Sequence, residues 1–161
     1  MVRITKKQKL ENDKKYKHVV LKLFLTEGHE ALTHARVAQE LSISISTLQG
    51  YFPTVDVMKR VVHEHIIPLM IESLDFSYPS TFHDSWEKAL TEKPFRHSIE
   101  LMFFHASQQS TVRDINLQIK EEFQKVIGAN FCSDIQQAID LAVGRSLFTL
   151  LYCADSSTDK L

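Results

Sequence analysis

The 161-residue sequence has little cysteine, glycine or proline, and it contains no long apolar run. The two cysteines, Cys132 and Cys153, lack the C-x-x-C spacing of a zinc site and are too few for a disulfide framework. No stretch approaches the roughly 20 apolar residues that cross a bilayer. The charged opening segment lacks the apolar core of a secretory signal. We therefore expect a cytoplasmic protein with no membrane partner.

The sequence also lacks the patterns that accompany enzyme chemistry. It has neither a nucleophile elbow nor a glycine-rich phosphate loop. His97 and His105 would share one helix face, but no further ligands stand at metal-binding spacing. We expect no catalytic residue, no metal and no cofactor, and an enzyme is the most distant of the alternatives.

Apolar residues recur at helical spacing, and no strand-like alternation is present, so we predict an all-α fold. A first helix is predicted over residues 11–27, with Gly28 ending it. Thr33 and Ser44 are the predicted N-caps of two short helices separated by a turn at residues 42–44. Pro53 is expected to end the second of these short helices.

A longer helix is predicted from about Thr54 through Ile66, and we expect Pro68 to kink or break it. The remaining helices are predicted over residues 84–92, 95–109, 111–128 and 133–153. The tail from residue 155 to 161 is expected to be frayed. The sequence thus predicts an N-terminal domain over residues 1–62 and a helical effector and dimerisation domain over residues 63–161.

The net charge of −1 conceals an uneven distribution. Residues 1–60 carry eleven Lys or Arg against six acidic residues, a net charge of +5, and the remainder carries −6. A basic first third and an acidic remainder favour a polyanionic partner for the first third only. A solvated lysine-rich segment is the alternative interpretation.

The segment 32–58 carries the most informative motif. Two short helices joined by a three-residue turn, with a polar outward side on the second, are typical of a helix-turn-helix. A wider pattern over about residues 14–62 includes Leu23-Phe24, Gly28, Leu32-Thr33, Val37-Ala38, Ile43-Ser44, Thr47-Leu48 and Tyr51-Phe52-Pro53. In these residues and their spacing, the chain resembles the tetracycline-repressor family of bacterial regulators.

The resemblance implies a DNA-binding, homodimeric repressor that responds to a ligand. It implies phosphate contacts from Thr33, Ser44 and Tyr51, and base-edge contacts from Ser46, Thr47 and Gln49. Ile45 could touch a thymine methyl. We add Arg36 to this set, together with a flexible basic arm that would lie along the phosphates and includes Arg3, Lys6, Lys7, Lys9, Lys14 and Lys15.

The sequence departs from the family pattern at several of these positions. Ser42 replaces the turn glycine, Gln49 replaces a phosphate-contacting tyrosine, and Val55 replaces a customary lysine. These losses leave a second hypothesis open, in which the chain is a helical protein–protein interaction module on the same fold with weakened DNA binding. Binding of a palindromic promoter sequence would distinguish the two hypotheses.

Residues 69–161 show no motif of their own. Their aromatic and sulfur side chains predict either an ordinary core or a pocket for a small apolar effector. The residues expected to line such a pocket are Met70, Met102, Phe103, His105 and Gln108. The last helix carries more apolar surface than one buried stripe needs, which predicts dimerisation. The residues expected at the dimer interface are Ile135, Ala138, Ala142, Leu147 and Leu151.

Overall fold

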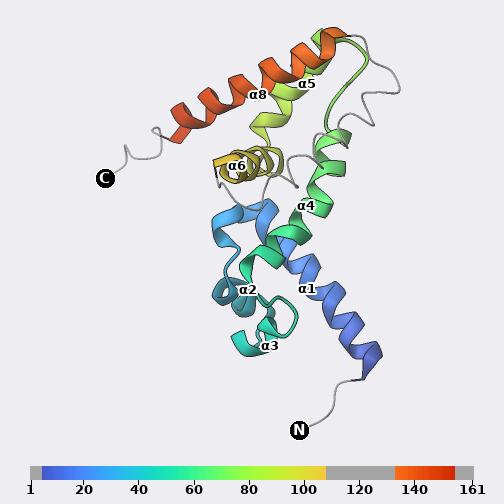
Figure 1. Ribbon diagram of the computed structural model, residues 1–161, viewed down its shortest axis with the longest axis vertical. Coiled ribbons are helices and arrows are strands. Elements are labelled where there is room, and N and C mark those ends of the chain that lie inside the picture. Colours follow the sequence, from blue (N-terminus) through green and yellow to red (C-terminus); the bar gives the residue numbers. More distant parts are fainter. Residues whose placement is uncertain (1–4, 108–132, 155–161) are drawn as a thin grey trace. The chain divides into compact units, whose positions relative to one another are not determined.

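The computed structural model describes residues 5–107 and 133–154 of the chain (Figure 1). Every regular element in these ranges is a helix, and they contain no strand, which confirms the all-α fold class. The chain divides into two compact units, Met1–Ile66 and Ile67–Leu161, which are described separately below. The helix predicted over residues 111–128 lies outside the described residues, as do Arg3, both cysteine side chains and the tail.

Helix α1 spans Lys6–Glu27 and begins five residues earlier than the sequence pattern predicted. Thr5 caps it, because the Thr5 hydroxyl accepts from the Gln8 backbone N–H at 3.2 Å and the Gln8 side chain accepts from the Thr5 N–H at 3.0 Å. This reciprocal capping box satisfies two backbone donors at the helix start. Gly28 ends the helix as expected, with a φ of 86° that favours glycine.

Two short helices follow a 3₁₀ turn at His29–Ala31. Helix α2 spans His34–Leu41, and helix α3 spans Ile45–Gln49. Both predicted N-caps are confirmed, since the Thr33 hydroxyl accepts from the Arg36 N–H at 3.1 Å and the Ser44 hydroxyl accepts from the Thr47 N–H at 3.2 Å.

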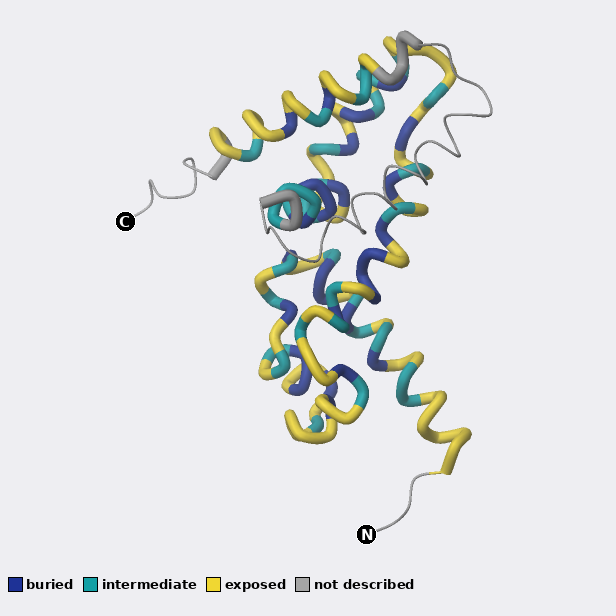
Figure 2. Tube along the Cα trace, viewed as in Figure 1, coloured by how far each residue is buried: buried dark blue, intermediate teal, exposed yellow. Residues whose placement is uncertain are grey.

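Helix α3 ends before Pro53, contrary to the prediction. The chain turns at Gly50 and Tyr51 instead, and the Phe52 N–H still bonds the Leu48 carbonyl at 2.9 Å. This turn places Phe52 in the core, where it is 1% exposed. The first unit is thus built around the large buried side chains of Phe24, Leu32, Leu48, Phe52, Met58 and Ile66. Figure 2 colours the buried positions of the trace dark blue.

Helix α4 spans Val55–Glu72 and passes from the first unit into the second. Of the two expected effects of Pro68, a kink or a break, the break does not occur, because the helix continues to Glu72. Pro68 lies near the C-terminal end of the helix and is exposed. A proline at this position removes one backbone hydrogen bond close to the end of the helix. The last turns of α4 still place Met70 in the core of the second unit.

The second unit contains α5 (Pro79–Thr91), α6 (Lys93–Ser107) and α8 (Ser133–Ala154). Helix α5 begins earlier than predicted because Pro79 stands at its first turn, where a missing N–H costs nothing. Trp86 lies at the centre, with Phe82 at 5.6 Å and Phe95 at 5.1 Å between ring centroids. The core is completed by Met70, Leu74, Ala89, Ile99 and Ala142.

Candidate nucleic-acid interface

Helix α3 presents a polar surface over a buried apolar anchor. Leu48 is fully buried, whereas Ser44, Ser46, Thr47 and Gln49 are exposed. The Ser44 hydroxyl lies 3.0 Å from the Ser46 hydroxyl and 2.8 Å from that of Thr47. Two of the three predicted base-reading residues, Ser46 and Thr47, therefore lie in a hydroxyl cluster with Ser44 at the start of α3. The 46% exposed Ile45 lies beside them in sequence.

Backbone and side-chain hydrogen bonds fix α3 against α2. The Ile43 N–H donates to the Ala38 carbonyl at 3.0 Å, across the turn between the two helices. His34, in the first turn of α2, lies with Nε2 2.7 Å from the Phe52 carbonyl oxygen. Because a carbonyl only accepts, His34 is the donor. The segment on either side of α3 is thus tied to α2.

Arg36 makes contacts that the sequence analysis missed. Its Nε donates to Glu27 at 3.0 Å and its Nη1 donates to Glu40 at 3.0 Å, while Lys22 also contacts Glu40 at 3.1 Å. The hydrogen bonds to Glu27 and Glu40 raise the pKa of Arg36, and those from Arg36 and Lys22 lower the pKa of Glu40. The guanidinium therefore joins α1 to α2, and each of its three nitrogens donates to a carboxylate.

Tyr51 comes two residues after the end of α3 and is held by side chains of α1. The Asn12 amide donates to the Tyr51 hydroxyl at 3.2 Å. The Tyr16 and Tyr51 rings form an edge-to-face pair with centroids 4.8 Å apart. Burial, and then the neighbouring Tyr51, raise the pKa of Tyr16. The motif contains no spacing that relates residue 12 to residue 51, so the contact of Asn12 with Tyr51 could not be predicted from the sequence.

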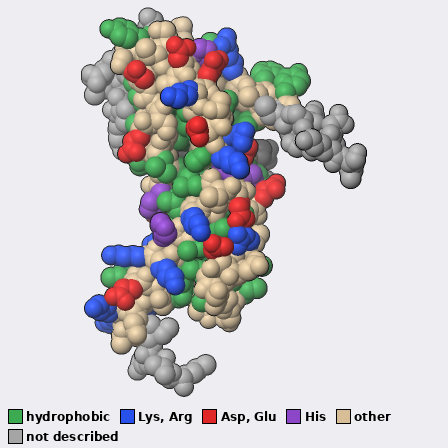
Figure 3. All heavy atoms as spheres, turned by 180° about the vertical axis from the view of Figure 1, so that it is seen from behind, with side chains coloured by type: hydrophobic (Ala, Val, Ile, Leu, Met, Phe, Trp, Pro, Cys, Tyr) green, Lys and Arg blue, Asp and Glu red, His purple; other side chains and the backbone are tan. Residues whose placement is uncertain are grey.

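The lysines near the N-terminus differ from the expected flexible arm. Lys6, Lys7 and Lys9 lie in the first turns of α1, because the Thr5 capping box starts the helix ahead of them. They are exposed, as are Lys14 and Lys15. Figure 3 shows Lys and Arg side chains gathered at this part of the first unit. The basic charge is therefore carried by a helix.

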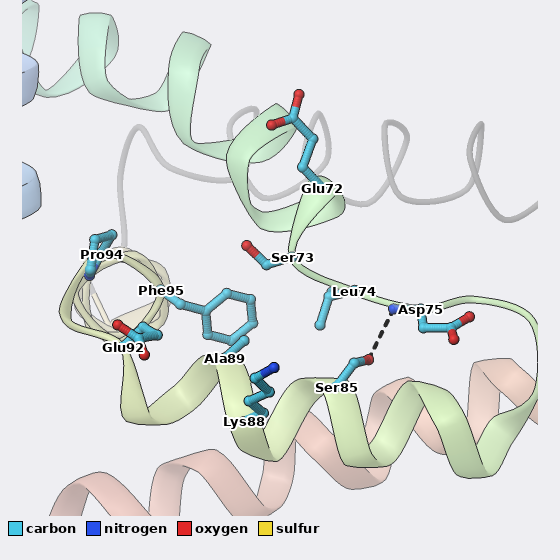
Figure 4. Close-up of a pocket in the computed structure, with 10 residues that line it drawn as sticks. All are labelled: Glu72, Ser73, Leu74, Asp75, Ser85, Lys88, Ala89, Glu92, Pro94 and Phe95. Atoms are coloured by element: carbon cyan, nitrogen blue, oxygen red, sulfur yellow. Dashed lines mark hydrogen bonds between the residues drawn. The ribbon is translucent and has the colours of Figure 1, made fainter.

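The second unit contains a cavity of about 530 Å³ between the end of α4, the side of α5 and the start of α6 (Figure 4). The Phe95 ring points toward Leu74 and Ala89 at its floor. Ser85 accepts a hydrogen bond from the Asp75 N–H at 2.9 Å at one side. The lining residues are Glu72, Ser73, Leu74, Asp75, Ser85, Lys88, Ala89, Glu92, Pro94 and Phe95.

The expected pocket residues whose side chains the structure describes, Met70, Met102 and Phe103, do not line this cavity. Met70 is 2% exposed and belongs to the core, and Met102 and Phe103 pack against that core. The side chain of His105 and the whole of Gln108 lie outside the described residues. The sequence could not separate core from pocket because both use the same apolar side chains.

The predicted dimer residues fall into two groups. Ala142 is 2% exposed and the partly buried Ala138 packs against the same core, so both alanines face their own unit and Ala142 is not open to a partner. Leu147 is 40% exposed and Leu151 is 59% exposed. The Ile135 side chain lies outside the described residues. The structure adds three exposed apolar side chains on α8, at Leu141, Phe148 and Tyr152.

In the part of the chain that the structure describes, no group of three or more His, Cys, Asp or Glu side chains is arranged to hold a metal ion. None of the helices described has the length and apolarity needed to cross a membrane.

Residues 63–150 match the sequence profile of the tetracycline repressor LuxT C-terminal domain. The chain belongs to the tetracycline-repressor family. The match covers more than half of the chain and lies almost wholly beyond the N-terminal motif that carried the resemblance, so the two parts of the sequence indicate the same family independently. Members of this family are transcription regulators, a non-enzymatic kind of protein. No curated protein matches the chain.

Proposed function

We propose that this protein regulates transcription by binding double-stranded DNA with residues 33–52 as a helix-turn-helix. The observation that carries the proposal is the two-sided character of α3. Its buried Leu48 anchors the helix, and its outward side gathers Ser44, Ser46 and Thr47. A polar recognition helix held by its neighbours suits entry into the major groove.

The proposed contacts divide by chemistry. Ser46, Thr47 and Gln49 read base edges, and Ile45 packs against a thymine methyl. Hydroxyls of Thr33, Ser44 and Tyr51 bind phosphates, and the α1 lysines at positions 6, 7 and 9 add charge. We assign Arg36 to the support of α2, because its guanidinium is already engaged by Glu27 and Glu40.

We further propose a homodimer whose interface is the outward side of α8. Leu141, Phe148 and Tyr152 follow one another at helical spacing and are 53%, 61% and 75% exposed. Such a row of large apolar side chains on a helix whose other side already packs the core is typical of an association surface. A two-fold dimer would pair the two recognition helices with two half-sites.

A response to a small effector is proposed for the second unit. Its cavity has an apolar floor of Leu74, Ala89 and Phe95, and its volume falls in the range of about 300–1,000 Å³ typical of ligand sites. Binding there would regulate the protein if the DNA-bound and free forms differ in affinity for the effector.

The DNA-binding proposal is tested by recovering fragments of sheared genomic DNA on the purified full chain and sequencing them. We expect enrichment of a palindromic sequence, and we expect Thr47→Ala or Gln49→Ala to change which sequence is preferred. Recovery of fragments without any shared sequence by both the wild type and the variants would contradict sequence-specific regulation.

The protein–protein module remains a second candidate function. It is favoured by the replacement of two customary phosphate contacts at Gln49 and Val55 and by the engagement of Arg36 with carboxylates. If no duplex is bound even at low salt, where phosphate contacts are strongest, this second function replaces the first.

A further inference from the structure

The hydrogen bond between Asn12 and Tyr51 has a direction that matters for DNA binding. The Asn12 amide nitrogen, on α1, donates to the Tyr51 hydroxyl oxygen at 3.2 Å. A phenol carries one donor hydrogen and two acceptor lone pairs. Because Tyr51 accepts from Asn12, its own hydrogen stays available for another acceptor.

The Tyr51 side chain is also held at its ring. Tyr16 lies one helical turn beyond Asn12 on α1, is 6% exposed, and contacts the Tyr51 ring edge to face at 4.8 Å. Tyr51 itself is half-buried and comes two residues after α3 ends at Gln49. Two contacts from one helix therefore fix both the ring and the hydroxyl of a residue adjoining the recognition helix.

We propose that Asn12 is a positioning residue that makes the Tyr51 hydroxyl a hydrogen-bond donor to a DNA phosphate. Phosphate oxygens only accept hydrogen bonds, so a tyrosine whose hydrogen was used within the protein would present only acceptors to them. The amide of Asn12 prevents this by supplying the donor of the internal bond. This inference rests on the proposed DNA-binding function.

The probe is a fluorescently labelled duplex of mixed sequence, because phosphate contacts do not depend on base sequence. Tyr51→Phe removes the donor and is expected to weaken binding about tenfold, as for a hydrogen bond to a charged group. The loss should be equal at all salt concentrations, since a neutral hydroxyl releases no counterion. Asn12→Ala frees the hydroxyl to rotate and should weaken binding about threefold.

The Asn12→Asp variant distinguishes two roles for Asn12: orienting the Tyr51 hydroxyl and stabilising the fold. A carboxylate at position 12 would accept the Tyr51 hydrogen, so the internal bond would persist while the donor to DNA would be lost. We expect Asn12→Asp to weaken binding about tenfold more in the wild-type background than in the Tyr51→Phe background. His18→Asp, which adds the same charge at an exposed position of α1, serves as the matched control.

Equal effects of Asn12→Asp in the two backgrounds would overturn the proposal and leave the bond a structural link between α1 and the end of α3. Thermal unfolding followed by circular dichroism checks that each variant is folded. Should Asn12→Asp unfold, Tyr51→Phe alone decides, because undiminished affinity would show that Tyr51 makes no such contact. A wild-type chain that binds no duplex at low salt would overturn the proposed function and this inference together.

Discussion

At the scale of single residues, Ser42 shows the cost of a departure from the family pattern. It ends α2 in the left-handed conformation, with a φ of 54°. A residue with a Cβ is disfavoured there by roughly 1–2 kcal/mol, and glycine is not. A glycine there would avoid this cost, but part of the stabilisation would be offset because glycine loses more backbone entropy on folding.

Ser42→Gly is therefore expected to raise the free energy of unfolding by about 0.5–1 kcal/mol. Urea unfolding followed by circular dichroism measures the change. Ser44→Gly serves as the contrast, because Ser44 has a negative φ of −73° and its side chain caps α3. We expect this variant not to raise the free energy of unfolding. A Ser42→Gly chain less stable than the wild type would show that the serine side chain contributes a stabilising contact.

The contacts of Glu40 predict a dependence of stability on pH. Hydrogen bonds from Arg36 and Lys22 lower the pKa of Glu40 below its ordinary 4.5 in the folded chain. A carboxyl whose folded pKa is lowered stabilises the fold above its unfolded pKa, and this contribution is lost as the pH falls through the folded pKa. We expect Glu40→Gln to flatten the fall of the thermal midpoint below pH 4.5, and an unchanged slope would contradict this.

At the scale of elements, the helices show which parts of the fold could be predicted from sequence. The caps at Thr33 and Ser44 and the end of α1 at Gly28 followed from local chemistry and were correct. The start of α1 was missed because the stripe of apolar residues begins later than the Thr5 cap. The continuation of α4 past Pro68 to Glu72 was not predicted, because the local cost of a proline does not by itself decide between a kink and a break.

The candidate site was less accessible to sequence reasoning than the helices were. The polar face of α3 could be predicted from spacing, but the bonds of Asn12 to Tyr51 and of Arg36 to Glu27 join different elements of the fold. On α8, Ala142 was expected at the dimer interface, whereas it packs within its own unit. The pattern of a single sequence predicts helical periodicity and helix caps, but it does not predict which side chains contact one another in the folded chain.

The packing of α5 on α8 depends on one polar bond within an apolar core. The Trp86 indole N–H donates to the Ser146 hydroxyl at 2.8 Å, and that hydroxyl donates to the Ala142 carbonyl at 2.8 Å. Ser146→Ala would leave the buried indole N–H without an acceptor and should destabilise the second unit by about 1–3 kcal/mol. Thr149→Ala, which removes a similar but exposed bond to the Arg145 carbonyl, should cost much less. Equal losses in the two variants would contradict this account.

At the scale of the whole molecule, the proposed dimer surface gives a prediction that differs from the sequence-based one. Ala142→Arg would disrupt the core of the second unit rather than only the dimer, because Ala142 is buried. Phe148→Arg instead changes an exposed side chain, and we expect it to raise the dissociation constant at least about thirtyfold, as for a central interface residue.

Analytical ultracentrifugation over a range of concentrations measures this dissociation. Asp84→Arg places the same side chain at an exposed position on α5 and is expected to leave association unchanged. A wild-type chain that is monomeric at micromolar concentration would rule out the dimer. A Phe148→Arg chain that associates like the wild type would place the interface elsewhere.

Trp86 is the chain's single tryptophan, and its position gives the protein an internal optical reporter. Its indole is 2% exposed in the second unit, so its fluorescence emission reports on that unit alone, whereas circular dichroism reports on the helices of both. Comparing the two signals during unfolding shows whether the units melt together. The Phe95 ring that faces the indole at 5.1 Å also forms part of the cavity floor, so an occupant of the cavity should change the emission and allow titration without a label.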